Sequence, residues 1–142
     1  MGAAITTYGL AAGIVEPLKN PEDANIDLVQ LNASVVYPAG TVIAEVTATP
    51  GVYGPYATGG AGGLANASLI LQYSVATDAS GNIFMGTGAV SEWTQPMAAA
   101  PAFRSGYFNC ADIIAPDTGW VAKMGRLVQG TATAGHVMIY GN

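Results

Sequence analysis

Few side chains in this sequence could carry out acid–base or nucleophilic chemistry. The chain has one histidine, His136, placed directly before an apolar run, and one cysteine, Cys110, with neither a nearby histidine nor a CxxC partner. Such neighbours lower a thiol pKa enough for nucleophilic catalysis. We therefore interpret His136 as a structural or surface residue and Cys110 as a small buried hydrophobe. No His/Cys cluster has the spacing of metal ligands.

Three carboxylates in the second half of the chain, Glu92, Asp112 and Asp117, remain as candidates. A small hydrolase could use Glu92 and Asp112 together, provided that they lie within about 10 Å of each other in a cleft. However, Asp112 follows a turn-like FNCA stretch and Asp117 follows a proline, and a carboxylate at such places commonly caps a turn or helix. We expect capping roles, no enzymatic activity and no cofactor.

The aromatic residues offer a different kind of site. Trp93, Trp120 and the seven tyrosines could stack on sugar rings, so a carbohydrate-binding β-sandwich is an alternative. That alternative predicts a monomer with an exposed Trp93 or Trp120. In a chain this poor in charge, aromatic residues more often belong to a core or a subunit interface.

The composition restricts the possible partners. Only 9% of the 142 residues are charged, against about 25% in an ordinary soluble domain. A net charge of −5 with four basic residues cannot neutralise many phosphates, so we expect no nucleic-acid partner. The uncharged tract between Glu45 and Asp78 must be buried in the domain or in a partner. The N-terminal residues fit neither a signal peptide nor a membrane span, and we expect no membrane partner.

The chain divides into an arm and a body. Residues 1–20 are small and apolar, lack a steady period and end in Pro17, Asn20 and Pro21, which predicts a flexible N-terminal arm. Residues 21–142 are predicted to form a single β-rich domain. Alternating apolar residues predict a bulged strand over 26–35 and a C-terminal strand that includes Val137 and Ile139. Further strands are expected over 42–47, 52–56 and on both sides of a turn at 78–82, with turns at 38–40 and 50–51 and a flexible loop over 58–66.

Helix is expected in one short segment. Residues 117–127 place Trp120, Lys123, Met124 and Leu127 at helical spacing, with Asp117 or Thr118 as the cap. Gly125 weakens this helix by about 1 kcal/mol relative to alanine. The fold class predicted from the residues is therefore mainly β with one or two short helices.

Three segments, in order along the chain, resemble a known family. YPAGTVIAEVTATPGVYGPYA resembles the strand and following G-x-Y-x-P-Y turn of the lambda-like phage head decoration proteins. SLILQYSVATDASG is similar to the family's small apolar strand and polar turn, and FRSGYFNCADIIAP to its aromatic-basic-Ser-Gly-x-Phe segment. The resemblance covers roughly residues 38–116. Residues 86–101, which include Trp93, look like an insertion.

The resemblance implies a small subunit with a β-clip or β-tulip-like body and an extended arm. It implies a homotrimer on local threefold sites of the expanded head, bound to the major capsid protein. The location would be the outer surface of the virion, after synthesis in the host cytoplasm. The arm would add a strand to a capsid-protein sheet, which suits a segment without structure of its own. Deletion of residues 1–15 is then expected to leave a folded trimer that no longer binds heads.

Particular residues are assigned to these roles. Arg104 and Ser105 are expected to form a turn at a strand end, and Cys110 to fill space. The residues expected in trimer or core packing are Tyr53, Tyr56, Phe103, Arg104, Tyr107 and Phe108. The residues expected in the capsid-binding arm are Ala4, Ile5, Thr6, Thr7, Tyr8, Gly9 and Leu10.

Overall fold

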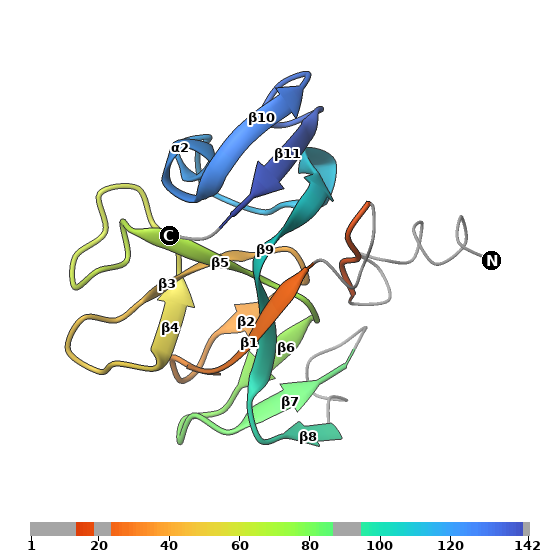
Figure 1. Cartoon of the computed structure of the whole chain (residues 1–142). Coiled ribbons are helices and arrows are strands. Elements are labelled where there is room, and N and C mark those ends of the chain that lie inside the picture. Colours follow the sequence, from red (N-terminus) through yellow and green to blue (C-terminus); the bar gives the residue numbers. More distant parts are fainter. Residues whose placement is uncertain (1–13, 19–23, 87–94, 141–142) are drawn as a thin grey trace.

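The computed structural model describes residues 14–18, 24–86 and 95–140, and these residues are mainly β (Figure 1). The predicted fold class is therefore confirmed. The predicted capsid-binding residues 4–10 lie outside the described residues, as do Glu92 and Trp93.

Five strands pair in a closed ring. They are β1 (Asn25–Leu31), β4 (Val52–Pro55), β3 (Val42–Glu45), β5 (Ala67–Leu71) and β9 (Ala100–Asn109). β1 closes the ring because it pairs parallel with β4 on one side and antiparallel with β9 on the other. β3 joins β4 to β5, and β5 pairs with β9. Consequently, none of these five strands leaves a full edge open to solvent.

β9 extends beyond the ring and builds a second part of the same sheet. Its first half pairs with β1 and β5, and its second half pairs with β11 (His136–Ile139), whose other edge holds β10 (Gly125–Gln129). Figure 1 shows β9 running from the ring to the β10–β11 hairpin. The change of partners occurs around Gly106, whose φ of +148° favours glycine. β11 lies within the predicted C-terminal strand.

A smaller antiparallel sheet covers one end of the ring. It contains β2 (Val36–Tyr37), β6 (Val75–Thr77), β7 (Ile83–Met85) and β8 (Gln95–Met97), in that order. The predicted turn at 78–82 connects β6 to β7, and the Asp78 carboxylate accepts hydrogen bonds from Ser80 and Asn82. Pro96 is compatible with β8 because β8 lies at an edge of this sheet, where a missing N–H costs little.

The central strands are buried on both faces, which explains their continuous apolar runs. Val42 and Ile70 face one core cluster, together with the short helix and the hairpin. Ile43 and Leu69 face the other cluster, which lies between the ring and the small sheet. A strand buried on both faces needs apolar residues at every position, so its sequence loses the period of two.

A glycine turn brings distant parts of the chain together. Gly40, in the predicted turn at 38–40, has a φ of +89°, and a Cβ there would collide with the carbonyl oxygen of Asp112. Ile114 donates a backbone hydrogen bond to the Gly40 carbonyl, and Val42 donates one to Ile114, both at 2.9 Å. The contact fixes the 3₁₀ turn η4 (Cys110–Asp112) against the ring.

The predicted bulged strand and the predicted helix are both shorter in the structure than expected. The strand predicted over 26–35 ends at Leu31, because a turn that includes Ser34 (φ 61°) separates β1 from β2. The helix predicted over 117–127 is only α2 (Trp120–Met124), and Leu127 lies in β10. Gly125 ends the helix with an extended backbone, and its close approach to the Met138 carbonyl leaves no room for a Cβ.

Candidate partner-binding surface

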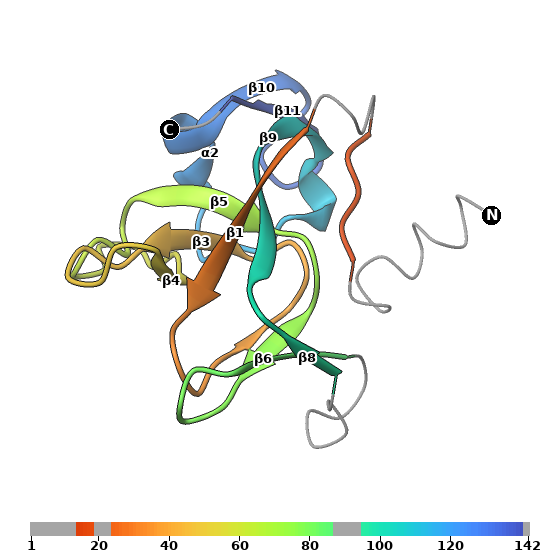
Figure 2. The same ribbon diagram turned by 60° about the horizontal axis from the view of Figure 1, so that its bottom comes forward.

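Residues 14–18 cross the outside of the ring, and we call them the strap. Figures 1 and 2 both show the strap beside β9. Val15 donates a backbone hydrogen bond to the Gln72 carbonyl at 2.8 Å, and Leu18 donates one to the Tyr107 carbonyl at 2.7 Å. The Val15 side chain is 2% exposed and belongs to the core. The sequence placed these five residues in a flexible arm without structure of its own. They are instead packed on the body, because Val15 gains burial there.

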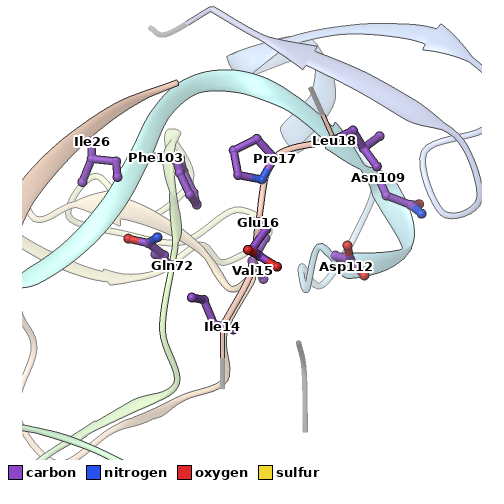
Figure 3. Close-up of a pocket in the computed structure, with 10 residues that line it drawn as sticks. All are labelled: Ile14, Val15, Glu16, Pro17, Leu18, Ile26, Gln72, Phe103, Asn109 and Asp112. Carbon is purple, nitrogen blue, oxygen red and sulfur yellow. The ribbon is translucent and has the colours of Figure 1, made fainter. Parts of the chain in front are cut away.

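A groove separates the strap from the body (Figure 3). Its volume is about 360 Å³. Ile14, Pro17 and Leu18 of the strap line one side, and Ile26 of β1 and Phe103 of β9 line another. The groove is open and has a mixed lining, in which apolar side chains alternate with Glu16, Gln72, Asn109 and Asp112, and its shape suits an extended chain segment.

Among the residues that the structure describes, the charged groups at this groove are both acidic. Glu16 and Asp112 line it, and none of its ten lining residues is basic. Burial raises the pKa of the Asp112 carboxyl above its usual value. Asp112 does not have the capping role expected for it, because within the described residues the 3₁₀ turn is capped by Asn109, whose side-chain oxygen accepts a hydrogen bond from the Ala111 N–H. The groove therefore favours a neutral or basic partner over an acidic one.

Exposed large apolar side chains gather in two places among the described residues. One group lies beside the groove and the other on the β10–β11 hairpin and just beyond it. The first group is Leu18, Ile26 and Leu28, and the second is Leu127, Val128, Met138 and Tyr140. Val36 and Ile114 are exposed elsewhere. Apolar groups of this kind on a chain with little charge are typical of association surfaces.

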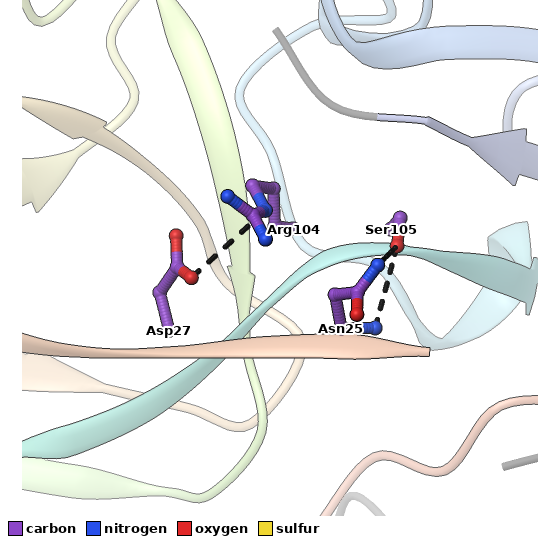
Figure 4. A network of polar contacts seen from close by, with 4 residues as sticks. All are labelled: Asn25, Asp27, Arg104 and Ser105. Carbon is purple, nitrogen blue, oxygen red and sulfur yellow. Dashed lines mark hydrogen bonds and ion pairs between the residues drawn. The ribbon is translucent and has the colours of Figure 1, made fainter. Parts of the chain in front are cut away.

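Arg104 and Ser105 lie inside β9, so the turn predicted at these residues is wrong. The reason is that β1 and β9 continue to pair here, with Asn25 opposite Ser105. Figure 4 shows the contacts: the Asn25 side-chain amide donates to the Ser105 hydroxyl at 2.9 Å, and Arg104 Nε lies 3.9 Å from Asp27 Oδ1. Because both charged side chains are well exposed, this ion pair adds little stability.

The aromatic residues predicted for packing have different environments. Phe103 and Phe108 are buried in the subunit's own core, with ring centroids 4.9 Å apart. Tyr56 is also buried, whereas Tyr53 and Tyr107 are half-buried. Side chains as enclosed as Phe103 and Phe108 cannot reach a second subunit. Any subunit contact through this set must use Tyr53, Tyr107 or the exposed Arg104.

Asp117 organises a polar cluster at the start of the helical segment. Its carboxylate accepts hydrogen bonds from the Thr58 hydroxyl at 2.6 Å, the Tyr56 hydroxyl at 2.9 Å and the Gly119 N–H at 2.9 Å. These bonds, the one from Thr58 first, lower the pKa of Asp117. The bond to Gly119 is the turn-capping role predicted for Asp117. The N-cap of α2 is Gly119 itself, so Asp117 caps the preceding turn and not the helix.

Cys110 and His136 lie on neighbouring parts of the chain, because His136 pairs with Asn109 and Cys110 donates a backbone hydrogen bond to the Gly135 carbonyl at 2.8 Å. Cys110 is buried, and burial raises the pKa of its thiol, which opposes thiolate formation. His136 Nδ1 lies 3.3 Å from the Tyr107 hydroxyl. Trp120 is 2% exposed and fills the core, so it cannot form the sugar platform considered above. The pairing of Asp112 with Glu92 lies outside the described residues.

Two kinds of site are absent from the described parts of the chain. No three His, Cys, Asp or Glu residues among them are grouped so that they could hold a metal ion. No helix in those parts has the length and apolar character needed to cross a membrane.

Comparison of the chain with protein-family profiles, curated proteins and solved structures gives no match.

Sequence reasoning missed the strap and the groove that it forms. A signal was present, because Ile14 and Val15 are adjacent β-branched apolar residues in a segment otherwise dominated by small residues. Such a pair has high strand propensity. The isolated bridge between Ile14 and Tyr73 is consistent with this reading. Pro17, Asn20 and Pro21 are typical of a loop, and they led to a predicted arm that extends to residue 20. In the structure, residues 14–18 are already packed on the body.

Proposed function

We propose that this chain is a phage head decoration protein that binds as a homotrimer to local threefold sites of the expanded head. It attaches to the major capsid protein on the outer surface of the virion and stabilises the shell against internal genome pressure. The observation that carries the proposal is the strap. An anchored segment holds the uncharged residues 1–13 at one fixed point on a β-rich body, which suits binding by strand addition.

The energetics require more than backbone pairing. Six arm residues, 4–9, forming six net hydrogen bonds gain roughly 3 to 9 kcal/mol. Ordering their backbone costs on the order of 6 to 12 kcal/mol. Burial of Ile5, Tyr8 and Leu10 adds roughly 1.5 to 3 kcal/mol for each large side chain. The arm of a single subunit is therefore a weak ligand.

The proposed trimer strengthens this attachment. Three arms on one body bind as a multivalent ligand, and linking sites in this way raises affinity by about 10² to 10⁴ without new contacts. The strap contributes because it limits the positions that each arm root can occupy. A fixed root raises the effective concentration of the arm at its site.

The test uses expanded, undecorated heads of the phage that encodes the chain. Co-sedimentation should show binding of the full chain and loss of binding, by about 100-fold or more, when residues 1–13 are deleted. The deletion must stop before Val15, because the 1–15 deletion considered from the sequence would remove a buried core side chain. The truncated protein should keep the oligomeric mass and thermal stability of the full chain.

Two results would contradict the proposed function. One is a full-length chain that does not bind the heads at micromolar concentration. The other is a truncated chain that binds as tightly as the full chain, which would remove the arm from the mechanism.

A further inference from the structure

The outer face of β1 carries apolar residues where an exposed strand usually carries polar ones. Val29 and Leu31 point into the core, so Ile26, Leu28 and Gln30 point outward. Leu28 is 72% exposed and Ile26 is 46% exposed. We call Ile26 and Leu28 the β1 row. Burial within the subunit does not explain the row, and neighbouring exposed apolar residues on one face can form part of a contact surface.

The β1 row lies next to the point where the arm leaves the body. Leu28 pairs with Pro101 of β9, and the Pro101 carbonyl accepts a hydrogen bond from Gln72 at 3.1 Å. The Gln72 carbonyl in turn accepts the hydrogen bond from Val15. Ile26 also lines the groove that the strap forms (Figure 3). A continuous series of backbone contacts thus connects the start of the strap to the row.

We propose that the β1 row and the adjoining groove receive the capsid-protein strand with which the arm pairs. This inference rests on the proposed function and assigns the body a part in it. Leu10, the last residue of the proposed capsid-binding arm, is four residues from Ile14, or at most about 14 Å of extended chain. A strand paired with the arm lies only about 5 Å from it. The partner strand is therefore held close to the surface at which the strap begins.

The surface also defines the chemistry of its occupant. An extended segment with apolar side chains would cover Ile26 and Leu28 and enter the groove beside Leu18. The carboxylates of Glu16 and Asp112 repel an acidic segment at this place, and no lining residue of the groove is basic. The occupant is thus an apolar strand with neutral or basic flanking side chains.

The test replaces both row residues by threonine, which keeps strand propensity while removing apolar surface. In the full chain, Ile26→Thr with Leu28→Thr should weaken binding to expanded heads by about tenfold or more and leave the oligomeric mass unchanged. Val36→Thr is a matched control, because Val36 is 50% exposed and lies on β2, outside both exposed apolar groups. This control should bind within about twofold of the wild type, since β2 belongs to the other sheet.

Each other outcome overturns the inference in a recognisable way. If the double variant dissociates into monomers, the row is covered by a second copy of this chain and not by the capsid protein. If the double variant binds heads as tightly as the wild type, the row has no role in attachment, although the proposed function stands. If the wild type itself does not bind, the proposed function fails and the inference fails with it.

Discussion

At the scale of single residues, the surroundings of Cys110, Asp117 and Asp112 decide what each side chain does. Cys110 is a buried space-filling residue, as its lack of a catalytic partner indicated. Asp117 caps a turn, as expected after Pro116, but its bonds to Tyr56 and Thr58 span about sixty positions of sequence and could not be read from local spacing. Asp112 differs from its expected role because Gly40 packs on its backbone and leaves the carboxylate at the groove.

The Asp117 cluster gives a pH-dependent prediction. Tyr56→Phe removes the hydroxyl that donates to the Asp117 carboxylate. Because hydrogen bonds lower the folded-state pKa of Asp117, their stabilisation is present above its unfolded pKa of about 4 and is lost as pH falls through the folded value. We expect the variant to lower Tm by a few degrees at pH 7 and to match the wild type near pH 2, measured by calorimetry.

The control for this prediction is Tyr53→Phe, because Tyr53 is a half-buried tyrosine that does not bond to Asp117. Its Tm difference from the wild type should not change between the two pH values. An equal Tm loss for Tyr56→Phe at both pH values would show that packing of the ring, and not the bond to the carboxylate, is responsible.

At the scale of elements, local patterns predicted strands and turns, whereas tertiary packing decided their ends. The turns predicted at 38–40 and 78–82 are both present. Each is stabilised by its own residues: Gly40 adopts a positive φ, and the Asp78 carboxylate accepts a hydrogen bond from the Ser80 N–H. The helix was predicted too long because residues 125–129 pair with β11, and this long-range pairing overrides helical spacing. The strap was missed because its stability comes from the burial of Val15 in a distant core and not from its own sequence period.

The strap can be tested by one substitution in its buried residue. Val15→Ala removes two buried methyl groups and should lower the free energy of unfolding by about 1 to 3 kcal/mol, measured by denaturant titration. Hydrogen exchange of the Val15 and Leu18 amides should accelerate, because both bonds hold the strap to the body. Leu18→Ala, at a residue that is 43% exposed, should change stability much less. Unchanged amide exchange in Val15→Ala would show that its side chain does not anchor the strap.

At the scale of the whole molecule, composition and pattern predicted a mainly β domain, but not the closed ring. Closure depends on β1, which pairs with β4 and β9 at the same time. These partners are far from β1 in sequence, and no local pattern specifies them. The sparse charge, in contrast, is visible in the sequence and has a direct consequence for association, since the exposed groups beside the groove and on the hairpin are apolar.

The proposed trimer should therefore be insensitive to salt. Apolar contacts do not weaken as ions screen charge, and only 9% of the residues are charged. Analytical ultracentrifugation should give the same oligomeric mass from about 0.05 to about 0.5 M NaCl, a range over which the Debye length falls severalfold. Dissociation at the higher salt concentration would instead assign the subunit interface to ion pairs between subunits.

β9 belongs covalently to both the ring and the three-stranded part of the sheet. A pull on the β10–β11 hairpin therefore passes through the hydrogen bonds between β11 and β9, and the backbone of β9 continues into the ring. The ladder of hydrogen bonds on both sides of β9 resists this pull collectively, so rupture should require many bonds to break at once. A body built in this way can carry mechanical tension as a single unit.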